Sequence, residues 1–357
     1  MANYIDKVQN MLENSQNDAV VLKSATMKKY LNTLTGSGCQ IVITKDKGYL
    51  FLDGRYLEEA KEREHDLEIH LIQENAISDI SKTLKACGCR KLALEDASTS
   101  VKMYQAYAQE GFELSLWSDE LGLLRIRKEE EEIQKIQLAV DMADEILVKV
   151  KDKIHIGMSE NEISALLHYY AISMGAQKMS FDTIVSSGPR TALPHGRPTN
   201  RKISAHEPIM MDFGVQLNNY QSDITRMVFI GKPSDKMLDI YNTVYEAQTT
   251  ALASIREGMT GQAVDAVARD IITKRGYGEY FGHGLGHGIG IGDGCEFPML
   301  NQSSTTILKE NMLMSCEPGV YVPGVGGVRI EDDVLIKNGV GVALNKTSKE
   351  LCILKEK

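Results

Sequence analysis

Long hydrophobic runs are absent from this sequence of 357 residues. No apolar stretch approaches the roughly 20 residues that a membrane-spanning helix needs. The opening segment MANYIDKVQNMLENSQND is too polar to act as a secretory signal peptide. We therefore expect a cytoplasmic protein that does not enter a membrane.

Cysteines are few, and basic residues are not in excess. Six cysteines in a chain of this length fit a reducing compartment better than a disulfide framework. Cys87 and Cys89 lack the second pair that a structural zinc site needs, so we interpret them as ordinary thiols. The formal charge of -9 argues against the basic surface that nucleic-acid binding requires, and no nucleic-acid partner is expected.

The length favours two domains, and the sequence pattern changes near position 125. Residues 1–125 alternate short aliphatic runs, such as CQIVIT and KLALED, with helical segments such as ISDISKTLKA, which predicts a small α/β domain. Beyond it, apolar residues recur at spacings of three and four from Ile133 to Val150 and predict one long amphipathic helix. Four glutamates at 129–132 fit its first turn, where the helix dipole favours negative charge. We expect a second, larger domain over residues 126–357.

The second domain contains a faint internal repeat. Segments that begin at Gly157 and Gly258 open with Gly-Met-Ser and Gly-Met-Thr, and both reach another glycine eighteen residues later, at Gly175 and Gly276. Each copy is typical of a glycine turn, a capped helix and a glycine stop. Strand-rich sequence follows each copy, which indicates two related halves.

Two aspartates lie on a predicted hairpin. The strand-like segments PIMMDFGVQ and YQSDITRMVFI are joined by Asn218-Asn219, a favourable tight-turn pair. With that turn, Asp212 lies opposite Asp223 or one diagonal step away, on the same face. Two carboxylates held together repel each other and need a cation or a shared proton, unless one of them is exposed to solvent.

A second hairpin offers two glutamates, and a glycine-rich segment offers a histidine. In MSCEPGVYVPGVGGVRIEDDVLI, Glu317 begins one arm, PGVGG forms the turn, and Glu331 lies on the returning strand. His287 lies among glycines, which allow close backbone approach to a ligand or unusual dihedral angles. Four carboxylates and one imidazole form an oxygen-rich set suited to two divalent ions such as manganese, cobalt or zinc.

These motifs resemble the dinuclear metallopeptidases of the pita-bread fold. The segments MDFG, YQSDITR, GHGIG, EPGVY and VRIEDD carry the likeness, which extends through SSGPRTALPHGRP to LTGSGC and LFLDGRY in the first domain. They are most similar to the branch of Xaa-Pro dipeptidase (prolidase) and Xaa-Pro aminopeptidase (aminopeptidase P). The resemblance implies an α+β protein whose carboxy-terminal pita-bread domain follows a smaller creatinase-type α/β domain. It also implies a homodimer that hydrolyses the Xaa-Pro bond of dipeptides or of peptide amino termini.

The resemblance assigns roles to the acidic residues and the histidine. The metal ligands that it implies are Asp212, Asp223, His287, Glu317 and Glu331. Asp223 and Glu331 would bridge two divalent ions, with manganese as the first expectation and cobalt or zinc as alternatives. A hydroxide shared by the ions would be the nucleophile, and Glu317 would also be the general base.

Three further residues match family positions around the substrate. His195, in LPHGRP, matches a histidine that contacts the substrate or the leaving group, and it would be the second catalytic residue. His283 and Arg329 match positions that line the substrate pocket. These roles rest on the resemblance, because a histidine in a proline-flanked loop is otherwise more often structural.

One histidine of the family is missing. The family usually carries it directly before a Glu-x-Pro segment, where it stabilises the oxyanion, and losing one such donor can cost about 10² to 10³ in turnover. The corresponding segment here, IGDGCEFP, has one extra residue. Aligned on Pro298, Cys295 takes the place of the histidine; counted from His287, Gly294 does. We include Cys295 among the residues of the substrate pocket.

Two alternatives to a metal-dependent exopeptidase therefore stay open. One is a pseudo-peptidase that retains the fold and uses its cleft for binding. The other is a metal-dependent hydrolase of a different amide, with a pocket reshaped at Cys295. The complete ligand set argues against a metal-free hydrolase, and only the site can decide among functions that share a fold.

Overall fold

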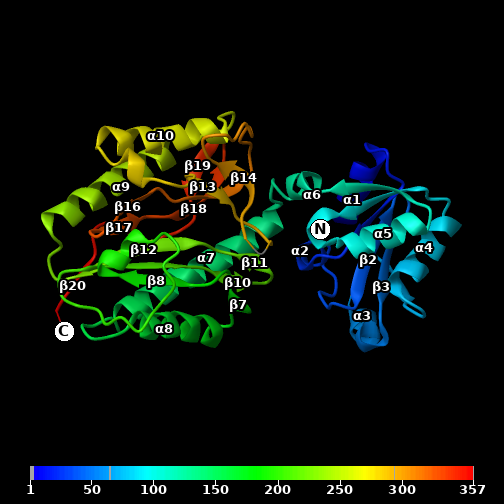
Figure 1. Ribbon diagram of the computed structural model, residues 1–357, viewed down its shortest axis with the longest axis horizontal. Helices are drawn as coiled ribbons and strands as arrows, with labels where there is room; N and C mark the ends of the chain where they lie inside the picture. The colour runs from blue at the N-terminus through cyan, green and yellow to red at the C-terminus, as the bar shows by residue number, and fades with distance from the viewer. Residues whose placement is uncertain (1–3, 64–65, 293, 357) are drawn as a thin grey trace. The chain divides into compact units, whose positions relative to one another are not determined.

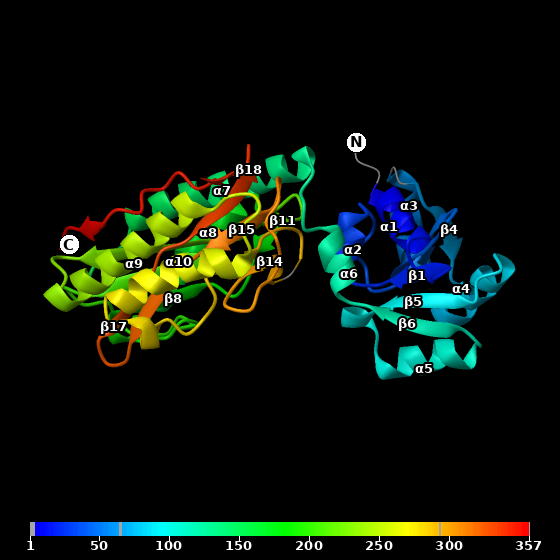
Figure 2. The same ribbon diagram turned by 90° about the horizontal axis from the view of Figure 1, so that it is seen from above.

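Two compact units make up the chain. The computed structural model describes residues 4–63, 66–292 and 294–356, and the chain divides into Met1–Arg125 and Ile126–Lys357. Figures 1 and 2 show the elements of each unit from two directions. Each unit has a hydrophobic core of its own, as expected of domains that fold around separate cores.

The first unit is built on a mixed six-stranded sheet. The sheet has the order β4-β3-β2-β1-β5-β6, with parallel pairing at both edges and antiparallel pairing of β1, β2 and β3. Its strands are β1 (Ala19–Leu22), β2 (Cys39–Thr44), β3 (Gly48–Leu52), β4 (Glu68–Leu71), β5 (Lys91–Glu95) and β6 (Glu113–Trp117). Its helices are α1 (Tyr4–Glu13), α2 (Ala25–Tyr30), α3 (Leu57–Glu62), α4 (Ala76–Ala86), α5 (Val101–Gln109) and α6 (Asp119–Leu124).

Alternate strand residues of this sheet build the core of the first unit. Val21, Val42 and Phe51 pack with Leu84 of α4 and Tyr107 of α5. These residues share one face because side chains alternate along a strand, and the residues between them are buried on the other face of the sheet. The predicted alternation of strands and helices over residues 1–125 is therefore observed in the described part of this unit.

Four long helices frame the second unit. They are α7 (Glu130–Lys151), α8 (Glu160–Ser173), α9 (Asp235–Ser254) and α10 (Gly261–Lys274). The predicted long helix is α7, and its start carries a capping box in which Glu129 and Glu132 bond each other's backbone amides. In Figure 1, α9 and α10 lie above the strands of this unit and α8 lies below them.

The strands of the second unit form two main sheets. The first has the order β20-β12-β9-β8, and the second has the order β14-β13-β15-β18-β19. The first half of the unit supplies β7 (Lys178–Met179), β8 (Ile184–Ser187), β9 (Pro208–Phe213), β10 (Val215–Leu217), β11 (Tyr220–Gln221) and β12 (Ile224–Ile230). The second half supplies β13 (Gly286–Gly288), β14 (Glu296–Leu300), β15 (Leu313–Cys316), β16 (Gly319–Val322), β17 (Gly326–Arg329), β18 (Asp332–Lys337), β19 (Val340–Ala343) and β20 (Ile353–Leu354).

The internal repeat predicted from the glycines is confirmed. The two copies form α8 and α10, whose N-caps are Ser159 and Thr260. Gly157 and Gly258, two residues before these caps, both have a positive φ, 86° and 88°. Such a φ strains residues with a side chain, which explains the glycines at equivalent places. The first half then supplies three strands of the four-stranded sheet, and the second half supplies the five-stranded sheet and β20 at the edge of the first.

The predicted aspartate hairpin is also confirmed. Asn218 and Asn219 both have positive φ and form the turn between β10 and β11. In the paired strands β9 and β12, Asp212 lies opposite Thr225. Asp223 directly precedes β12 and is two residues from Thr225, so the two aspartates lie one diagonal step apart on the same face.

The glutamate hairpin is broken where the sequence predicted continuous strands. Glu317 lies between β15 and β16, and Glu331 lies between β17 and β18 rather than inside the returning strand. β15 pairs with β18 in the five-stranded sheet, whereas β16 and β17 pair as a separate ribbon. Both pairs keep one register, so Glu317 and Glu331 face each other across the break. The break frees both side chains from the sheet faces.

No helix among the described residues is long and apolar enough to cross a membrane. This agrees with the absence of long hydrophobic runs in the sequence.

Candidate metal centre

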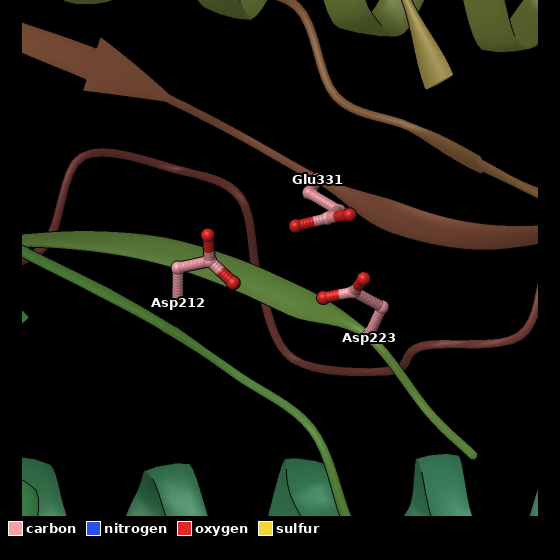
Figure 3. A group of neighbouring side chains, drawn as sticks. All are labelled: Asp212, Asp223 and Glu331. Carbon is pink, nitrogen blue, oxygen red and sulfur yellow. The ribbon is translucent and has the colours of Figure 1, made fainter. Parts of the chain in front are cut away.

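Three buried carboxylates converge in the second unit. Asp212 on β9, Asp223 before β12 and Glu331 before β18 point toward one another (Figure 3). One oxygen from each lies within 4.8 Å of the others. Their side chains are almost closed to solvent, with residue exposures of 6%, 7% and 1%. Each has one buried oxygen without a hydrogen-bond partner, which is the arrangement that a cation with oxygen ligands requires.

The neighbouring Asp332 shows what a satisfied buried carboxylate looks like here. Its oxygens accept hydrogen bonds from Arg226 at 2.6 Å, from Lys349 at 2.6 Å and from Gln248 at 3.0 Å. Burial opposes ionisation, but these two cations outweigh it and lower the pKa of Asp332. Glu331, one residue earlier, has no cationic side chain bonded to its carboxylate among the described residues.

The three converging acids have the opposite electrostatic character. Burial is the largest cause that raises the pKa of Asp212, of Asp223 and of Glu331. Neighbouring carboxylates add to the effect: Glu331 raises the pKa of Asp223, and Glu317 raises that of Glu331. Among the described residues, Asp212 is the one of the three that accepts a hydrogen bond from an arginine or lysine, because the Arg329 guanidinium donates to its carboxylate. A divalent ion would remove this repulsion, so the residues present fit a metal.

His287 and Glu317 lie beside these acids. His287 on β13 has its Nε2 3.5 Å from Glu317 Oε1 and 3.8 Å from Asp223 Oδ2. Its Nδ1 is 3.1 Å from the Gly288 carbonyl, which can only accept, so Nδ1 carries a proton and Nε2 faces the acids. Burial lowers the pKa of His287, but the Cys295 thiol and Glu317 raise it to about 10. Before metal binds, a proton on His287 therefore offsets part of the acidic charge.

Three residues that the sequence did not single out hold these side chains in place. The Thr225 hydroxyl donates to Glu331 Oε2 at 2.6 Å, and the Asp333 carboxylate accepts from the Asp223 backbone at 2.9 Å. Ser315 accepts from the His287 backbone at 3.0 Å and donates to Glu317 at 2.9 Å. The sequence signal that could have identified these three residues is their position, because each lies two residues from a predicted ligand.

The glycines around His287 have a different reason from the expected one. A Cβ on Gly286 would lie 2.1 Å from the Ser315 carbonyl oxygen, and one on Gly288 would lie 2.1 Å from that of Phe297. These glycines therefore let the backbones of β14 and β15 approach β13 closely, and they do not clear space for a ligand. Neither has a positive φ.

Comparison with known sequences decides the family. The profile of Metallopeptidase family M24 matches residues 134–338, and that of the Creatinase/Prolidase N-terminal domain matches residues 5–126. The chain belongs to metallopeptidase family M24. This membership confirms the predicted fold, a creatinase-type domain followed by a pita-bread domain, and the predicted class of metallopeptidase.

Several M24 relatives are similar over the full length of the chain. It is 35% identical over 349 residues to a protein of Pyrococcus furiosus named Xaa-Pro dipeptidase. The match covers 96% of this chain and 97% of that protein. A structure of Xaa-Pro dipeptidase from Bacillus anthracis has a TM-score of 0.94, with 36% identity over 98% of this chain and 99% of that chain. A structure of X-Pro aminopeptidase from Thermotoga maritima has a TM-score of 0.89, with 34% identity over 97% and 100%.

In this M24 domain one cavity contains the acids, the histidine and the predicted pocket residues. Its volume is about 510 Å³, within the range of small-ligand sites. His195 is an exposed residue of its wall. His283 also lines it, with Nε2 2.9 Å from the Tyr321 hydroxyl, and burial lowers its pKa. Arg329 lines it too, but its guanidinium is engaged by Asp212, Tyr321 and the Pro194 carbonyl.

Both candidates for the place of the family's histidine line the cavity. Cys295 lines the cavity, and the neighbouring His287 imidazole lowers the pKa of its thiol. Gly294 also lines the cavity, with a φ of 120° that a residue with a side chain would adopt only under strain. Of these two residues, Cys295 is the one that offers a side-chain group to the cavity.

Proposed function

We propose that this M24 chain is a metal-dependent exopeptidase that hydrolyses the Xaa-Pro bond of dipeptides or of peptide amino termini. The observation that supports this most strongly is the group of three buried carboxylates with unpartnered oxygens, flanked by His287 and Glu317 in one cavity. Full-length relatives named Xaa-Pro dipeptidase and X-Pro aminopeptidase support the substrate class.

In this proposal five residues hold two divalent cations. They are Asp212, Asp223, His287, Glu317 and Glu331, with Asp223 and Glu331 shared by both ions. Manganese is the first expectation, and cobalt or zinc would also suit the oxygen-rich set. When bound, the cations would lower the pKa of water toward neutrality and so supply the nucleophile for hydrolysis.

The chain's own side chains would then manage orientation and protons. Glu317 would accept a proton from the attacking water and deliver it to the leaving amine nitrogen. The Ser315 hydroxyl, 2.9 Å from Glu317 Oε1, fixes the orientation of that carboxylate. His195 lies on the cavity wall without being buried, a suitable place to contact the substrate or the leaving group.

Neither alternative is favoured over this proposal. The relatives named Xaa-Pro dipeptidase and X-Pro aminopeptidase support a peptidase over a binding protein that only retains the fold. A hydrolase of a different amide was considered because of Cys295, but neither the relatives nor the cavity point to another substrate class. The cysteine alters the site within an otherwise complete ligand set.

The test is hydrolysis by purified protein that has been stripped of metal and reloaded with manganese, cobalt or zinc. Substrates would be Xaa-Pro dipeptides, Xaa-Ala dipeptides and longer peptides that begin with Xaa-Pro. We expect metal-restored cleavage confined to Xaa-Pro bonds, and the relative rates would assign the chain as dipeptidase or aminopeptidase. Metal binding without cleavage of any Xaa-Pro substrate would overturn the proposal.

We also propose, from the family resemblance, that the chain works as a homodimer in the cytoplasm. Light scattering on the purified protein should give twice the mass of the chain. A monomeric mass at micromolar concentration would contradict the dimer without affecting the assignment of the site.

A further inference from the structure

Cys295 lies among the candidate ligands without a role in the proposed function. It is a free cysteine, and it lines the same cavity as the three converging acids, His287 and Glu317. Cys295 is exposed, and the neighbouring His287 imidazole lowers the pKa of its thiol. Nδ1 of His287 is engaged by the Gly288 carbonyl, so Nε2 is the ring nitrogen that remains for other contacts. Nε2 faces the acids.

The residue next to this cysteine, Glu296, is anchored by hydrogen bonds of its carboxylate. Glu296 is buried, and its carboxylate accepts from Lys128 at 3.1 Å and from the backbone of Gly292 at 2.6 Å. Glu296 also pairs with Gly288, directly after His287. Extending this register by one residue puts Cys295 opposite Ile289, on the same strand face as His287 and one diagonal step from it.

The second observation that points to a ligand is independent of the cysteine. Asp212, Asp223 and Glu331 are more than nine-tenths buried, and each directs an unpartnered oxygen into the site. A thiol that lines the same cavity beside an imidazole facing such a group lies where an additional metal ligand can reach. Sulfur and imidazole together favour zinc and cobalt, whereas manganese prefers oxygen.

We propose that Cys295 is a sixth protein ligand of the metal centre, which binds the same ion as His287 and makes that position selective for zinc or cobalt over manganese. The inference rests on the proposed dinuclear site and deepens it. When the ion binds, the sulfur–metal bond forms, and the thiol proton passes to solvent; no redox step takes place. The second position, held by carboxylates alone, keeps its preference for harder ions.

The first test is the absorption spectrum of the protein loaded with cobalt. A thiolate ligand produces a sulfur-to-cobalt charge-transfer band in the near ultraviolet, which oxygen and nitrogen ligands do not. We expect this band in the natural protein and in Cys87→Ser, a control that removes an exposed thiol of the first unit. The band should be absent from Cys295→Ser, although the weaker cobalt bands of the remaining ligands persist. A cobalt-loaded natural protein without the charge-transfer band overturns the inference.

The second test measures metal selectivity and does not depend on activity. Cys295→Ser should weaken zinc binding by at least the roughly 10- to 100-fold that loss of a ligand-supporting residue costs, while manganese affinity changes much less. Equal changes for zinc and manganese, or none, would overturn the inference and leave the proposed function intact. Failure of the natural protein to bind either metal would overturn both.

A third measurement needs no variant of the centre, in case Cys295→Ser does not fold. Alkylation of Cys295 by iodoacetamide in the natural protein can be followed by peptide mass spectrometry. Zinc at saturation should slow this alkylation at least tenfold, by roughly the fraction of thiol that stays unbound, and should leave Cys87 unaffected. Equal alkylation rates with and without zinc would show that the sulfur is not a ligand.

Discussion

A pair of cationic side chains separates the behaviour of two adjacent acidic residues. Asp332 is bonded to Arg226 and Lys349, and its pKa is lowered in spite of burial. Glu331 has Thr225 as its bonded partner and a second oxygen without one, and burial raises its pKa well above the usual value. Cationic side chains therefore neutralise Asp332 but not Glu331, and a bound metal ion could neutralise the charge of Glu331.

The bridging role of two acids gives the first prediction. Asp223→Asn and Glu331→Gln keep nearly the same volume but remove a charge that both ions would share. Each variant should therefore lose both metals, measured by elemental analysis after dialysis, and with them turnover. Asp152→Asn, on the exposed end of α7, is the matched control and should keep two ions per chain. Unchanged metal content in both bridging variants would show that the ligand assignment is wrong.

His195 gives a prediction of the opposite kind. It lies on the exposed wall of the cavity and is outside the group of candidate ligands. His195→Ala should leave metal content unchanged and lower kcat by about 10²-fold, the scale of losing one group that acts in the transition state. A loss of metal in this variant, or turnover equal to that of the natural protein, would contradict the role.

The sequence could predict which candidate ligands come together but not the residues that position them. Asp212 and Asp223 were paired correctly because Asn218-Asn219 is a local turn signal. Thr225 and Asp333 reach across more than 100 residues of chain to Glu331 and Asp223, and no local pattern reveals such contacts. Whether Cys295 or Gly294 replaces the family's histidine was also undecidable, because an inserted residue can be absorbed on either side of a loop.

At the scale of elements, the close packing of three short strands positions His287. β13 lies between β14 and β15, and its glycines allow both neighbours to approach. From the sequence, these glycines were expected to allow close approach to a ligand or unusual dihedral angles. Their actual role was hidden because a sequence does not show which backbones become neighbours. The break between β17 and β18 was likewise invisible, because hydrophobic residues continue on both sides of Glu331.

This packing predicts a stability difference between two glycines of the same segment. Gly288→Ala would bring a Cβ to 2.1 Å from the Phe297 carbonyl, whereas a Cβ on Gly282 would meet nothing within 4 Å. We expect Gly288→Ala to lower the free energy of unfolding by about 1–3 kcal/mol, the usual cost of overpacking. Gly282→Ala should change it by less than about 0.5 kcal/mol. Urea denaturation of both variants measures the difference, and equal stabilities would contradict the close approach.

At the scale of the whole molecule, the acids couple metal binding to stability. The raised pKa values of Asp212, Asp223 and Glu331 mean that the folded metal-free chain binds more protons than the unfolded chain. Its stability therefore falls as the pH rises from the ordinary carboxyl pKa near 4 through the raised values in the folded state. A metal that replaces those protons stabilises the fold most above that window.

Thermal unfolding at two pH values tests this coupling. At a metal concentration of 100 times the Kd at pH 8, which is then used at both pH values, binding at pH 8 should add about 2.7 kcal/mol, or roughly 5–10 °C in Tm for a domain of this size. The gain in Tm should be larger at pH 8 than at pH 5.5, with chelator-treated protein as the reference. A gain that is equal at both values, or larger at pH 5.5, would contradict the sign of the coupling.

We propose that five side chains form the centre that hydrolyses Xaa-Pro bonds: Asp212, Asp223, His287, Glu317 and Glu331. The most direct measurement is turnover of one Xaa-Pro dipeptide against the number of ions bound per chain, as metal-free protein is titrated with metal. We predict that turnover rises with bound metal, reaches its maximum at two ions per chain and is absent from Asp223→Asn at every ratio. Turnover that is independent of bound metal, or that persists in Asp223→Asn, would contradict the account.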